Sequence, residues 1–284
     1  MTDTDPDTLR ADMLERWDRA AVGWERAAEQ VREHGMPVSM AMIQRLALQP
    51  GQRVLELAAG PGETGLLAAE LVSPGGTLVS SDASEAMLEI ARARAKELGI
   101  GNVEFKRLEL AWIDLPTADV DAVLCRWGLM LVVDPEAAAR EMRRVLRPGG
   151  RLAVAVWDQS ITNPWATVPM AAMIELGHMQ PPPPGGPGMF ALAAPGAVQQ
   201  LLESVGFVDV DVGPVELSRT YVGIDAFLAE TLNLSMMFAD AFRRLDAAGQ
   251  DEVVRALTAN AAPFTDSDGS ITFPGRSLVA AARA

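Results

Sequence analysis

The first half of the chain alternates between two hydrophobic patterns. Short apolar runs, typical of buried strands, are followed by segments whose apolar residues recur every three to four positions, as on one face of a helix. The predicted strands are the run that begins at Val54 and residues 77–81, 102–107, 120–126 and 151–157. The predicted helices between them are 63–71, 85–98 and 134–146. This alternation over residues 52–157 predicts a doubly wound α/β fold with a parallel sheet.

The segments on either side of this alternation are mostly helical in pattern. Apolar residues at helical spacing over 9–31 and 36–48 predict an N-terminal helical arm, which we place at residues 8–48. After Asp158 the alternation stops. The elements predicted there are a Met-rich helix at 167–179, a stiff loop through the prolines of 181–188, a helix at 195–205, a strand at 207–217, helices at 224–245 and 251–260, and a last strand near 277–282. Together with the five strands above, these make seven.

A glycine-rich turn follows the first predicted strand. Gly60, Gly62 and Gly65 form a Gly-x-Gly-x-x-Gly pattern that opens directly into a predicted helix. Glycines permit positive φ and a close approach of a ligand to the backbone, and the start of the helix offers unpaired N–H groups. The pattern favours a nucleotide-binding turn. A plain strand-to-helix connection is the alternative.

One acid in the strand ahead of the turn indicates which kind of nucleotide is bound. Glu56 interrupts an otherwise apolar run, four residues before Gly60. A carboxylate at this place would repel the pyrophosphate of a dinucleotide, whereas it suits a ligand that carries a positive charge and hydroxyl groups. The turn therefore favours a cationic nucleoside over a dinucleotide.

Residues 54–65 resemble motif I of the class I methyltransferases that use S-adenosylmethionine, and residues 146–152 are also similar to this family. The resemblance is closest to the small-molecule methyltransferases related to ubiquinone and menaquinone C-methyltransferases. It covers residues 50–157 well and 190–217 more loosely. It implies S-adenosylmethionine as the cofactor and a Rossmann-like, seven-stranded sheet that is mostly parallel with an antiparallel last strand.

The resemblance also implies an organisation and an activity. We expect a single methyltransferase domain over residues 1–284, with helical lid insertions at 158–192 and 218–265 that cover the active site and vary with the substrate. The expected reaction is methyl transfer to an O, N or C atom of a small molecule. The family does not name that molecule, because the lid decides it.

An acid at the tip of the second predicted strand is the second candidate for cofactor binding. Asp82 follows Gly60 by 22 residues, where such folds hold ribose hydroxyls. The alternative is that Asp82 caps the next helix, a role that Ser84 could take instead. By resemblance, Glu56, Gly60 and Gly62 contact the methionine part of the cofactor, and Met87, Glu109 and Leu110 the adenine. The full set expected at the cofactor is Glu56, Ala58, Gly60, Gly62, Asp82, Ala83, Met87, Glu109, Leu110 and Arg126.

The sequence qualifies the role of Glu109 and also bears on the kind of ligand. Members of the family more often have Asp than Glu at the position of Glu109, and a solvated surface Glu is the alternative. The absence of Lys and Arg from the sequence around the glycine turn speaks against a phosphate ligand.

Tryptophans mark the expected acceptor pocket. Trp112, Trp127 and Trp157 fall at or just past the ends of predicted strands, the edge at which doubly wound sheets bind their ligands. They predict the wall of an apolar pocket, in which Trp127, Met130 and Trp157 face a largely apolar or aromatic acceptor. Packing of the core alone would explain the same composition.

The sequence offers few candidates for a catalytic group. Methyl transfer needs alignment of the two reactants, and a general base only if the acceptor arrives protonated. Of the two histidines, His178 in the expected lid is the candidate base and His34 the weaker one; a packed or surface histidine is the alternative for both. Cys125 is expected to be a buried structural cysteine rather than a nucleophile.

Composition limits the partners and the location. The formal net charge is −14 and no basic run is present, which argues against nucleic acid and against a membrane surface. No apolar stretch reaches the roughly 18 residues of a spanning helix, and the acidic N-terminus is unlike a signal peptide. With one cysteine and no metal motif, we expect a cytoplasmic enzyme without a metal. A homodimer is compatible with the sequence.

Two rival functions remain open from the sequence. A nicotinamide-dependent reductase would also use the three glycines and Asp82, although Glu56 argues against it. So does the absence of a Tyr-x-x-x-Lys pair, because Tyr221 is followed four residues later by Asp225. The second rival is a family member that keeps the cofactor site but does not methylate.

Overall fold

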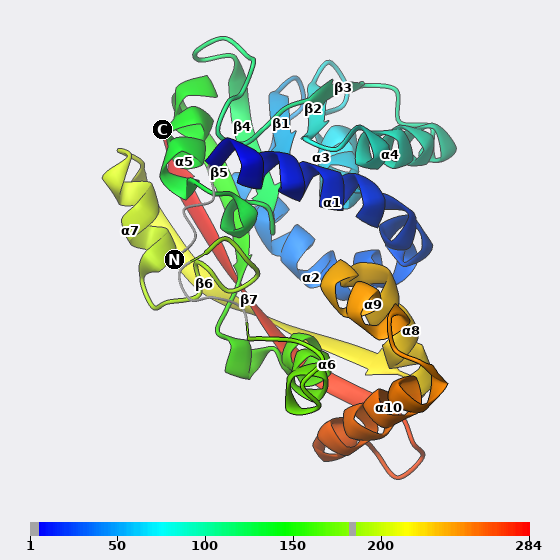
Figure 1. Ribbon diagram of the computed structural model, residues 1–284. Coiled ribbons are helices and arrows are strands. Elements are labelled where there is room, and N and C mark those ends of the chain that lie inside the picture. Colours follow the sequence, from blue (N-terminus) through cyan, green and yellow to red (C-terminus); the bar gives the residue numbers. More distant parts are fainter. Residues whose placement is uncertain (1–5, 182–185) are drawn as a thin grey trace.

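The centre of the molecule is a seven-stranded sheet (Figure 1). The computed structural model describes residues 6–181 and 186–284. The strand order is β3-β2-β1-β4-β5-β7-β6. The strands are β1 (Arg53–Leu57), β2 (Thr77–Asp82), β3 (Val103–Arg107), β4 (Val120–Arg126), β5 (Leu146–Trp157), β6 (Val208–Tyr221) and β7 (Ile271–Arg283). Strands β1 to β5 pair in parallel, and β7 runs antiparallel to both β5 and β6. The predicted doubly wound, Rossmann-like fold with an antiparallel last strand is confirmed.

Helices flank the sheet and close its core. Of these, α3 (Glu63–Val72), α4 (Glu85–Leu98), α5 (Pro135–Val145) and α7 (Ala197–Ser204) connect or follow the strands, and α2 (Ala28–Leu46) packs on β5, β6 and β7. The middle strands are buried on both faces, with Leu55 and Leu124 fully enclosed. That burial explains why the central strands read as continuous apolar runs.

Strands β6 and β7 continue past the rest of the sheet as a two-stranded ribbon. The pairing of β5 with β7 ends where Trp157 lies opposite Ser277, whereas residues 216–221 and 271–276 pair with each other alone. Because β6 runs in the direction of β1 to β5, the ribbon projects beyond their carboxyl ends. The helices α6 (Pro164–Glu175), α8 (Ile224–Leu234), α9 (Met236–Arg243) and α10 (Ala247–Ala261) surround it (Figure 1). We call the ribbon and these four helices the outer lobe.

The first helix, α1 (Pro6–Arg26), bridges the sheet domain and the outer lobe. It packs on α4 on one side and on α8 on the other (Figure 1). The contact with α8 is very close, because a Cβ atom at Gly23 would lie 2.1 Å from the carbonyl oxygen of Asn233. Glycine is therefore required where the two backbones meet, and α1 is held against both parts of the molecule.

Several boundaries differ from those that the sequence pattern predicts. The break between the first two helices falls at Ala27, and Pro37 lies inside α2. The single helix expected at 224–245 is two helices, because Ser235 caps α9 through the amide of Phe238 at 3.5 Å. The loop expected at 181–188 is described only in part, since residues 182–185 lie outside the described residues. Within the described ranges no helix is both long and apolar enough to cross a membrane.

Candidate active site at the carboxyl ends of the strands

The glycine-rich turn joins β1 to α3 at the carboxyl edge of the sheet. Gly60 and Gly62 have φ values of 53° and 88°, and Ala58 has a φ of 51° in the same left-handed region. A second connection touches this turn, because a Cβ atom at Gly128 would lie 2.4 Å from the Cβ of Ala58. Next to Gly128, Trp127 also has a positive φ, of 61°. Such strained non-glycine residues concentrate at functional sites, so both connections are candidates for ligand contact.

Glu56 lies beneath the turn. Its carboxylate is 2% exposed and accepts hydrogen bonds from the amide of Gly65 at 2.6 Å and from the hydroxyl of Ser80 at 2.9 Å. Burial raises the pKa of Glu56 to about 7, against the opposing effect of these two hydrogen bonds and of Arg126. The observed role of Glu56 is to hold the first turn of α3 against β1.

Asp82 binds the backbone at two points at the tip of β2. Its two carboxylate oxygens accept hydrogen bonds from the amides of Gly60 at 2.8 Å and Ser84 at 2.9 Å. Burial raises the pKa of Asp82, while the bonded amides act in the opposite direction. The cap of α4 is Ser84, whose hydroxyl accepts from the amide of Met87 at 3.2 Å. Asp82 is therefore free of the capping role and ties the tip of β2 to the glycine turn.

The N-terminal arm covers the start of α4. Met87 is 2% exposed and packs in one cluster with Ala20 and Ala21 of α1. The hydroxyl of Ser84 donates to the carboxylate of Asp18 at 2.5 Å. Helix α1 thus lies directly over the segment in which we expect the adenine and ribose.

The segment after β3 lies beside the tip of β2, because the amide of Leu108 donates to the carbonyl of Asp82 at 3.1 Å. Of the two residues expected at the adenine, Leu110 is buried and Glu109 is exposed. Trp112 is 76% exposed, so the expectation that it helps to line an apolar pocket with Trp127 and Trp157 is wrong. The short bridge between Glu109 and Trp112 turns this segment back on itself.

Arg126, the last residue of β4, brings a cation to the glycine turn. Its Nη1 atom is buried and has no hydrogen-bond partner among the described residues. Burial lowers the pKa of Arg126, and the nearby carboxylates of Glu56 and Glu63 oppose that change. The sequence places no basic residue next to the turn, and the fold supplies one from another strand. A buried guanidinium with a free donor is suited to an anionic ligand.

Three tryptophans meet at the end of β5. Trp127 stacks on Trp157 with ring centroids 4.2 Å apart, and Trp165 of α6 meets Trp157 edge-on at 4.9 Å. The indole N–H of Trp127 donates to the hydroxyl of Ser277 at 3.0 Å. Met130 is 3% exposed, and its sulfur accepts from the amide of Trp157 at 3.5 Å. Trp165 was not predicted to lie here, because only the fold brings α6 to this edge.

Three residues remain as possible catalytic groups, one cysteine and two histidines. The thiol of Cys125 is fully buried and burial raises its pKa to about 12, so it is not a reactive thiolate.

His178 follows α6 in the outer lobe, and its Nε2 is buried without a hydrogen-bond partner in the described part of the chain. His34 faces Glu230 in a buried polar cluster with Arg219 and Tyr221. The sequence named His34 only as the weaker candidate base and did not predict this cluster, whose members lie up to 196 positions apart.

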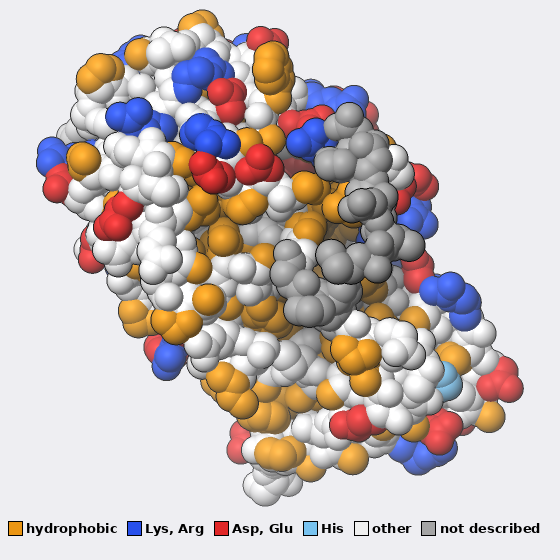
Figure 2. Space-filling model, turned by 60° about the vertical axis from the view of Figure 1, so that its left-hand side comes forward, with side chains coloured by type: hydrophobic (Ala, Val, Ile, Leu, Met, Phe, Trp, Pro, Cys, Tyr) orange, Lys and Arg blue, Asp and Glu red, His pale blue; other side chains and the backbone are white. Residues whose placement is uncertain are grey.

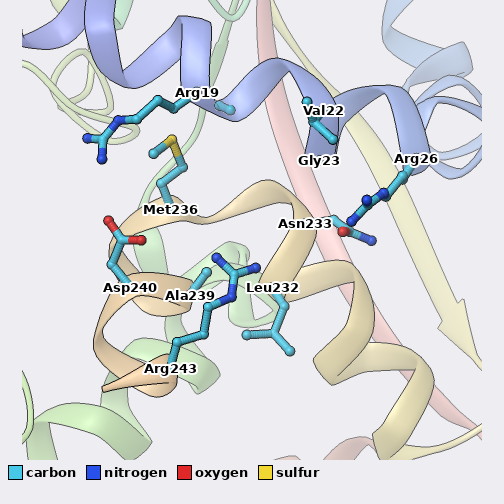
Figure 3. A pocket seen from close by; sticks show the side chains of 11 residues that line it. Arg19, Val22, Gly23, Arg26, Leu232, Asn233, Met236, Ala239, Asp240 and Arg243 are labelled. Carbon is cyan, nitrogen blue, oxygen red and sulfur yellow. The ribbon is translucent and has the colours of Figure 1, made fainter. Parts of the chain in front are cut away.

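A pocket of about 200 Å³ marks the junction between α1 and the outer lobe. Its lining comes from α1 on one side and from α8 and α9 on the other (Figure 3). Ala20 and Met236 line this pocket and also belong to the cluster around Met87. The pocket therefore lies next to the covered start of α4.

In the space-filling view, hydrophobic side chains gather over the middle of one face of the molecule (Figure 2).

Comparison with known proteins finds similarity to methyltransferases. Residues 48–177 match a family described as a methyltransferase domain. The chain is 34% identical over 122 residues to the ubiquinone/menaquinone biosynthesis C-methyltransferase UbiE of Pasteurella multocida, which covers 43% of this chain and 46% of the relative. Over these residues the chain is therefore similar to methyltransferase domains. It spans about half the length of the curated relatives that it matches.

Solved structures show the same fold at low sequence identity. The YcgJ protein of Bacillus subtilis matches with a TM-score of 0.57 at 16% identity, over 86% of this chain and 97% of its own. A phosphoethanolamine N-methyltransferase of Haemonchus contortus, solved with S-adenosylhomocysteine, matches with a TM-score of 0.52 at 16% identity, over 86% and 52%. The [4+2]-cyclase SpnF matches with a TM-score of 0.52 at 19% identity, over 86% and 79%.

The groups around the turn fit S-adenosylmethionine. The cofactor carries an α-carboxylate, a positive charge and ribose hydroxyls. The free donor of Arg126 suits the carboxylate, the acid Glu56 suits the positive charge, and Asp82 offers acceptor oxygens at the tip of β2. We therefore take the carboxyl ends of β1, β2 and β4 as the candidate cofactor site.

Proposed function

We propose that this protein transfers the methyl group of S-adenosylmethionine to an oxygen, nitrogen or carbon atom of a small, largely apolar or aromatic molecule. The observation that carries the proposal is the placing of three charged groups around the glycine turn. Glu56 lies beneath it and Asp82 bonds to its first glycine. Arg126, at the end of β4, is near enough to Glu56 to lower its pKa and keeps an unpaired buried donor beside Gly35 of α2. A methyltransferase domain match over residues 48–177 supports the same reaction class.

Asp82 is proposed to bind the ribose. Each of its oxygens already accepts one backbone amide, and each carboxylate oxygen can accept a further hydrogen bond. We place Ala83 beside it at the cofactor. Met87, Glu109 and Leu110 are proposed to surround the adenine, with exposed Glu109 available to accept from its amino group.

Arg126 is proposed to hold the carboxylate of the methionine part. A carboxylate there would satisfy the buried Nη1 donor, which no described residue satisfies. Ala58, Gly60 and Gly62 supply the strained backbone against which the methionine part lies, and Glu56 supports it from below.

The chain supplies alignment and a site from which water is excluded, and the bound cofactor supplies an activated methyl group. Helix α1 and the outer lobe would enclose the two reactants. Trp127, Met130 and Trp157 are proposed to face the acceptor, since they continue from the end of β4 toward the outer lobe. His178 stays a candidate for a base in this lobe.

Two rival functions are addressed by separate observations. A reductase with a nicotinamide dinucleotide is still disfavoured by Glu56, although Arg126 shows that a cation does reach the turn. A family member that does not methylate is the second rival, because the [4+2]-cyclase SpnF shares this fold. The charged groups fitted to the cofactor favour methyl transfer over the first rival, and an activity assay separates the second.

The rest of the proposal concerns the class of acceptor, the cellular location and the oligomeric state. The acceptor is a small molecule rather than a nucleic acid, since the net charge is −14. Action in the cytoplasm agrees with the single free cysteine, Cys125. A homodimer stays a prediction.

The experiment that tests the function is an assay for S-adenosylhomocysteine released from S-adenosylmethionine in the presence of a library of aromatic and apolar metabolites. We expect release that depends on one acceptor class and a product heavier by one methyl group. An Asp82→Ala protein is the control for activity from contaminants. Cofactor binding without release for any acceptor would favour the non-methylating rival.

A further inference from the structure

Unsatisfied polar atoms gather beside the tryptophans. The buried side-chain atoms without a hydrogen-bond partner among the described residues include Nη1 of Arg126, Nδ1 of His34, Nε of Arg219 and Oε2 of Glu230. Nδ1 of His34 and Oε2 of Glu230 face each other at 3.6 Å. Because most buried polar groups in folded proteins are paired, the other two atoms, in Arg126 and Arg219, call for a ligand or water that completes them. We call His34, Arg219, Tyr221 and Glu230 the polar cluster.

Glu230 holds the polar cluster together. Its Oε1 accepts from Nη1 of Arg219 at 3.0 Å and from the hydroxyl of Tyr221 at 2.7 Å. Its Oε2 lies 3.6 Å from Nδ1 of His34. The carboxylate is thus fixed by two donors from β6, and its remaining oxygen faces the imidazole from α2. A carboxylate in this relation orients a histidine and stabilises its protonated form.

The imidazole of His34 is in a state that can accept a proton. Its side chain is 9% exposed, and burial together with Arg219 lowers its pKa, while Glu230 and Glu33 act in the opposite direction. His34 is therefore neutral at neutral pH. Tyr221, whose ring centroid lies 5.9 Å from that of His34, keeps its proton because burial raises its pKa.

The polar cluster adjoins both proposed binding regions. A Cβ atom at Gly35, the residue after His34, would lie 2.1 Å from Nη1 of Arg126 and 3.3 Å from the ring of Trp127. On the other side, the guanidinium of Arg219 lies 3.5 Å from the ring centroid of Trp165. The cluster is therefore next to the cofactor site and to the tryptophans.

The charges of this region select among acceptors. Arg219 is buried and Arg126 is half-buried, and the two are close enough that Arg219 contributes to lowering the pKa of Arg126. Arg219 is balanced by Glu230, and Arg126 is proposed to be balanced by the carboxylate of the cofactor. The site therefore has no free carboxylate for a protonated amine, and a hydroxyl group that arrives uncharged fits it better. The neighbouring tryptophans favour an aromatic ring next to that oxygen.

We propose that the acceptor is an aromatic molecule with an ionisable hydroxyl group and that His34 takes the proton of this group. The proposal rests on the proposed function. The hydroxyl proton passes to Nε2 of His34, and the oxygen lone pair forms the new O–CH₃ bond. The S–CH₃ bond breaks with its electron pair kept by sulfur, which gives S-adenosylhomocysteine, and the imidazolium later releases its proton to water. Glu230 is the positioning residue for His34.

The test begins with a matched set of acceptors, 2-naphthol, 2-naphthoic acid and 2-(aminomethyl)naphthalene, with S-adenosylmethionine labelled in its methyl group. We expect label on 2-naphthol in preference to the amine. Label on the amine in preference to the naphthol, or on none of the three, would overturn the assignment of a hydroxyl acceptor. Calorimetric binding of S-adenosylhomocysteine is measured in parallel, and its absence would count against the proposed function instead.

Three substitutions then test the proton acceptor: His34→Gln, Glu230→Gln, and His178→Gln for the other candidate base. We expect His34→Gln to lower kcat by about 100-fold or more, with S-adenosylhomocysteine affinity retained. Glu252→Gln, at an exposed position outside the site, is the control and should behave like the wild type. An unchanged kcat in His34→Gln would contradict the proposal, as would a loss confined to His178→Gln.

The pH profile separates a proton acceptor from a merely structural histidine. We expect the acidic limb of kcat/KM in the wild type to report a group that titrates below the ordinary histidine pKa of 6.5. Glu230→Gln removes an anion beside His34, so this limb should move to lower pH. A limb that stays in place would contradict the assignment, and this result does not require that His34→Gln folds.

Discussion

The carboxylate of Glu56 accepts a hydrogen bond from the amide of Gly65 over 2.6 Å and so fastens the first turn of α3 to the end of β1. The contact leaves no room for a side chain, because a Cβ atom at Gly65 would lie 1.9 Å from Oε2 of Glu56. The third glycine of the turn is therefore required by packing against an acid. It is not required for positive φ, which only Gly60 and Gly62 of the three adopt.

Gly65→Ala should displace this acid. We expect a loss of about 1 to 3 kcal/mol in the free energy of unfolding, as for other overpacked sites, and a weaker affinity for S-adenosylhomocysteine. Urea unfolding and calorimetry measure the two effects. The matched control is Gly101→Ala, where a Cβ atom would meet nothing within 4 Å. Equal stability of the two variants would contradict the described packing.

Glu56 should also make stability depend on pH. Its pKa is raised from 4.5 to about 7 in the folded chain, so the folded state binds a proton that the unfolded state has lost over this range. Its contribution to stability is therefore largest below about pH 4.5 and falls as the pH rises through about 7. The fall is about 3 kcal/mol in all, an order-of-magnitude figure from the shift.

Glu56→Gln cannot lose that proton, so its free energy of unfolding should fall less than that of the wild type between about pH 4.5 and 7. Urea unfolding at a series of pH values gives the difference curve. Glu252→Gln, at an exposed position, controls for the loss of a surface carboxyl. Parallel curves for the wild type and Glu56→Gln would show that Glu56 is not titrating in this range.

The pattern of the sequence was sufficient for the sheet and for the local contacts of the turn. Buried parallel strands such as β1 and β4 are short, mostly apolar runs. When each run is followed by a helical pattern, strands are the only elements of this length that fit. Glu56 and Asp82 lie near the carboxyl ends of β1 and β2. Predicting where each strand ends was therefore enough to place both acids at the edge of the sheet. Ser84 as the cap of α4 was one of two alternatives that the sequence left open, and the structure decides for it.

The long ribbon of β6 and β7 could not be predicted in the same way. Pro274 and Gly275 are residue types that are common in turns, yet they pair with Ser218 and Leu217 inside the ribbon. Glycine is used there because a Cβ atom at Gly275 would lie 3.2 Å from the indole nitrogen of Trp165. The glycine is required by the close packing of α6, and that contact is not visible in the local sequence.

The charged part of the site depends on contacts between distant segments. Arg126 reaches the turn from β4, and His34 meets Glu230 across 196 positions. No periodicity records such a contact, because each residue occupies an ordinary position in its own helix or strand. The sequence and its resemblance could therefore predict the glycine turn, its acids and Arg126 at the cofactor, and they offered His34 as the weaker base. They could not predict that His34 meets Glu230 and Arg219.

Asp82→Ala should weaken cofactor binding. It removes a charge-assisted acceptor for the ribose and leaves the amide of Gly60 without its partner, so we expect a loss of about 1 to 3 kcal/mol in binding free energy. Calorimetry with S-adenosylhomocysteine measures it. Asp82→Asn keeps one acceptor oxygen and should lose less. An affinity unchanged in Asp82→Ala would remove the ribose assignment.

Arg126→Met should act on the amino-acid part of the cofactor alone. We expect it to weaken S-adenosylhomocysteine by about 1.5 to 3 kcal/mol, the range for hydrogen bonds to charged groups. The affinity for 5′-methylthioadenosine, which lacks the carboxylate, should change little. Calorimetric titration of both ligands gives the comparison. Equal losses for the two ligands would mean that Arg126 supports the site as a whole and does not hold the carboxylate.

The measurement that tests the central claim most directly is calorimetric titration of the wild-type protein with S-adenosylmethionine, S-adenosylhomocysteine and NADPH in parallel. We predict binding of the two sulfur ligands and none of NADPH, because Glu56 and Arg126 together match a ligand with a positive centre and a carboxylate. Binding of NADPH alone would contradict the account and would assign the glycine turn to a dinucleotide.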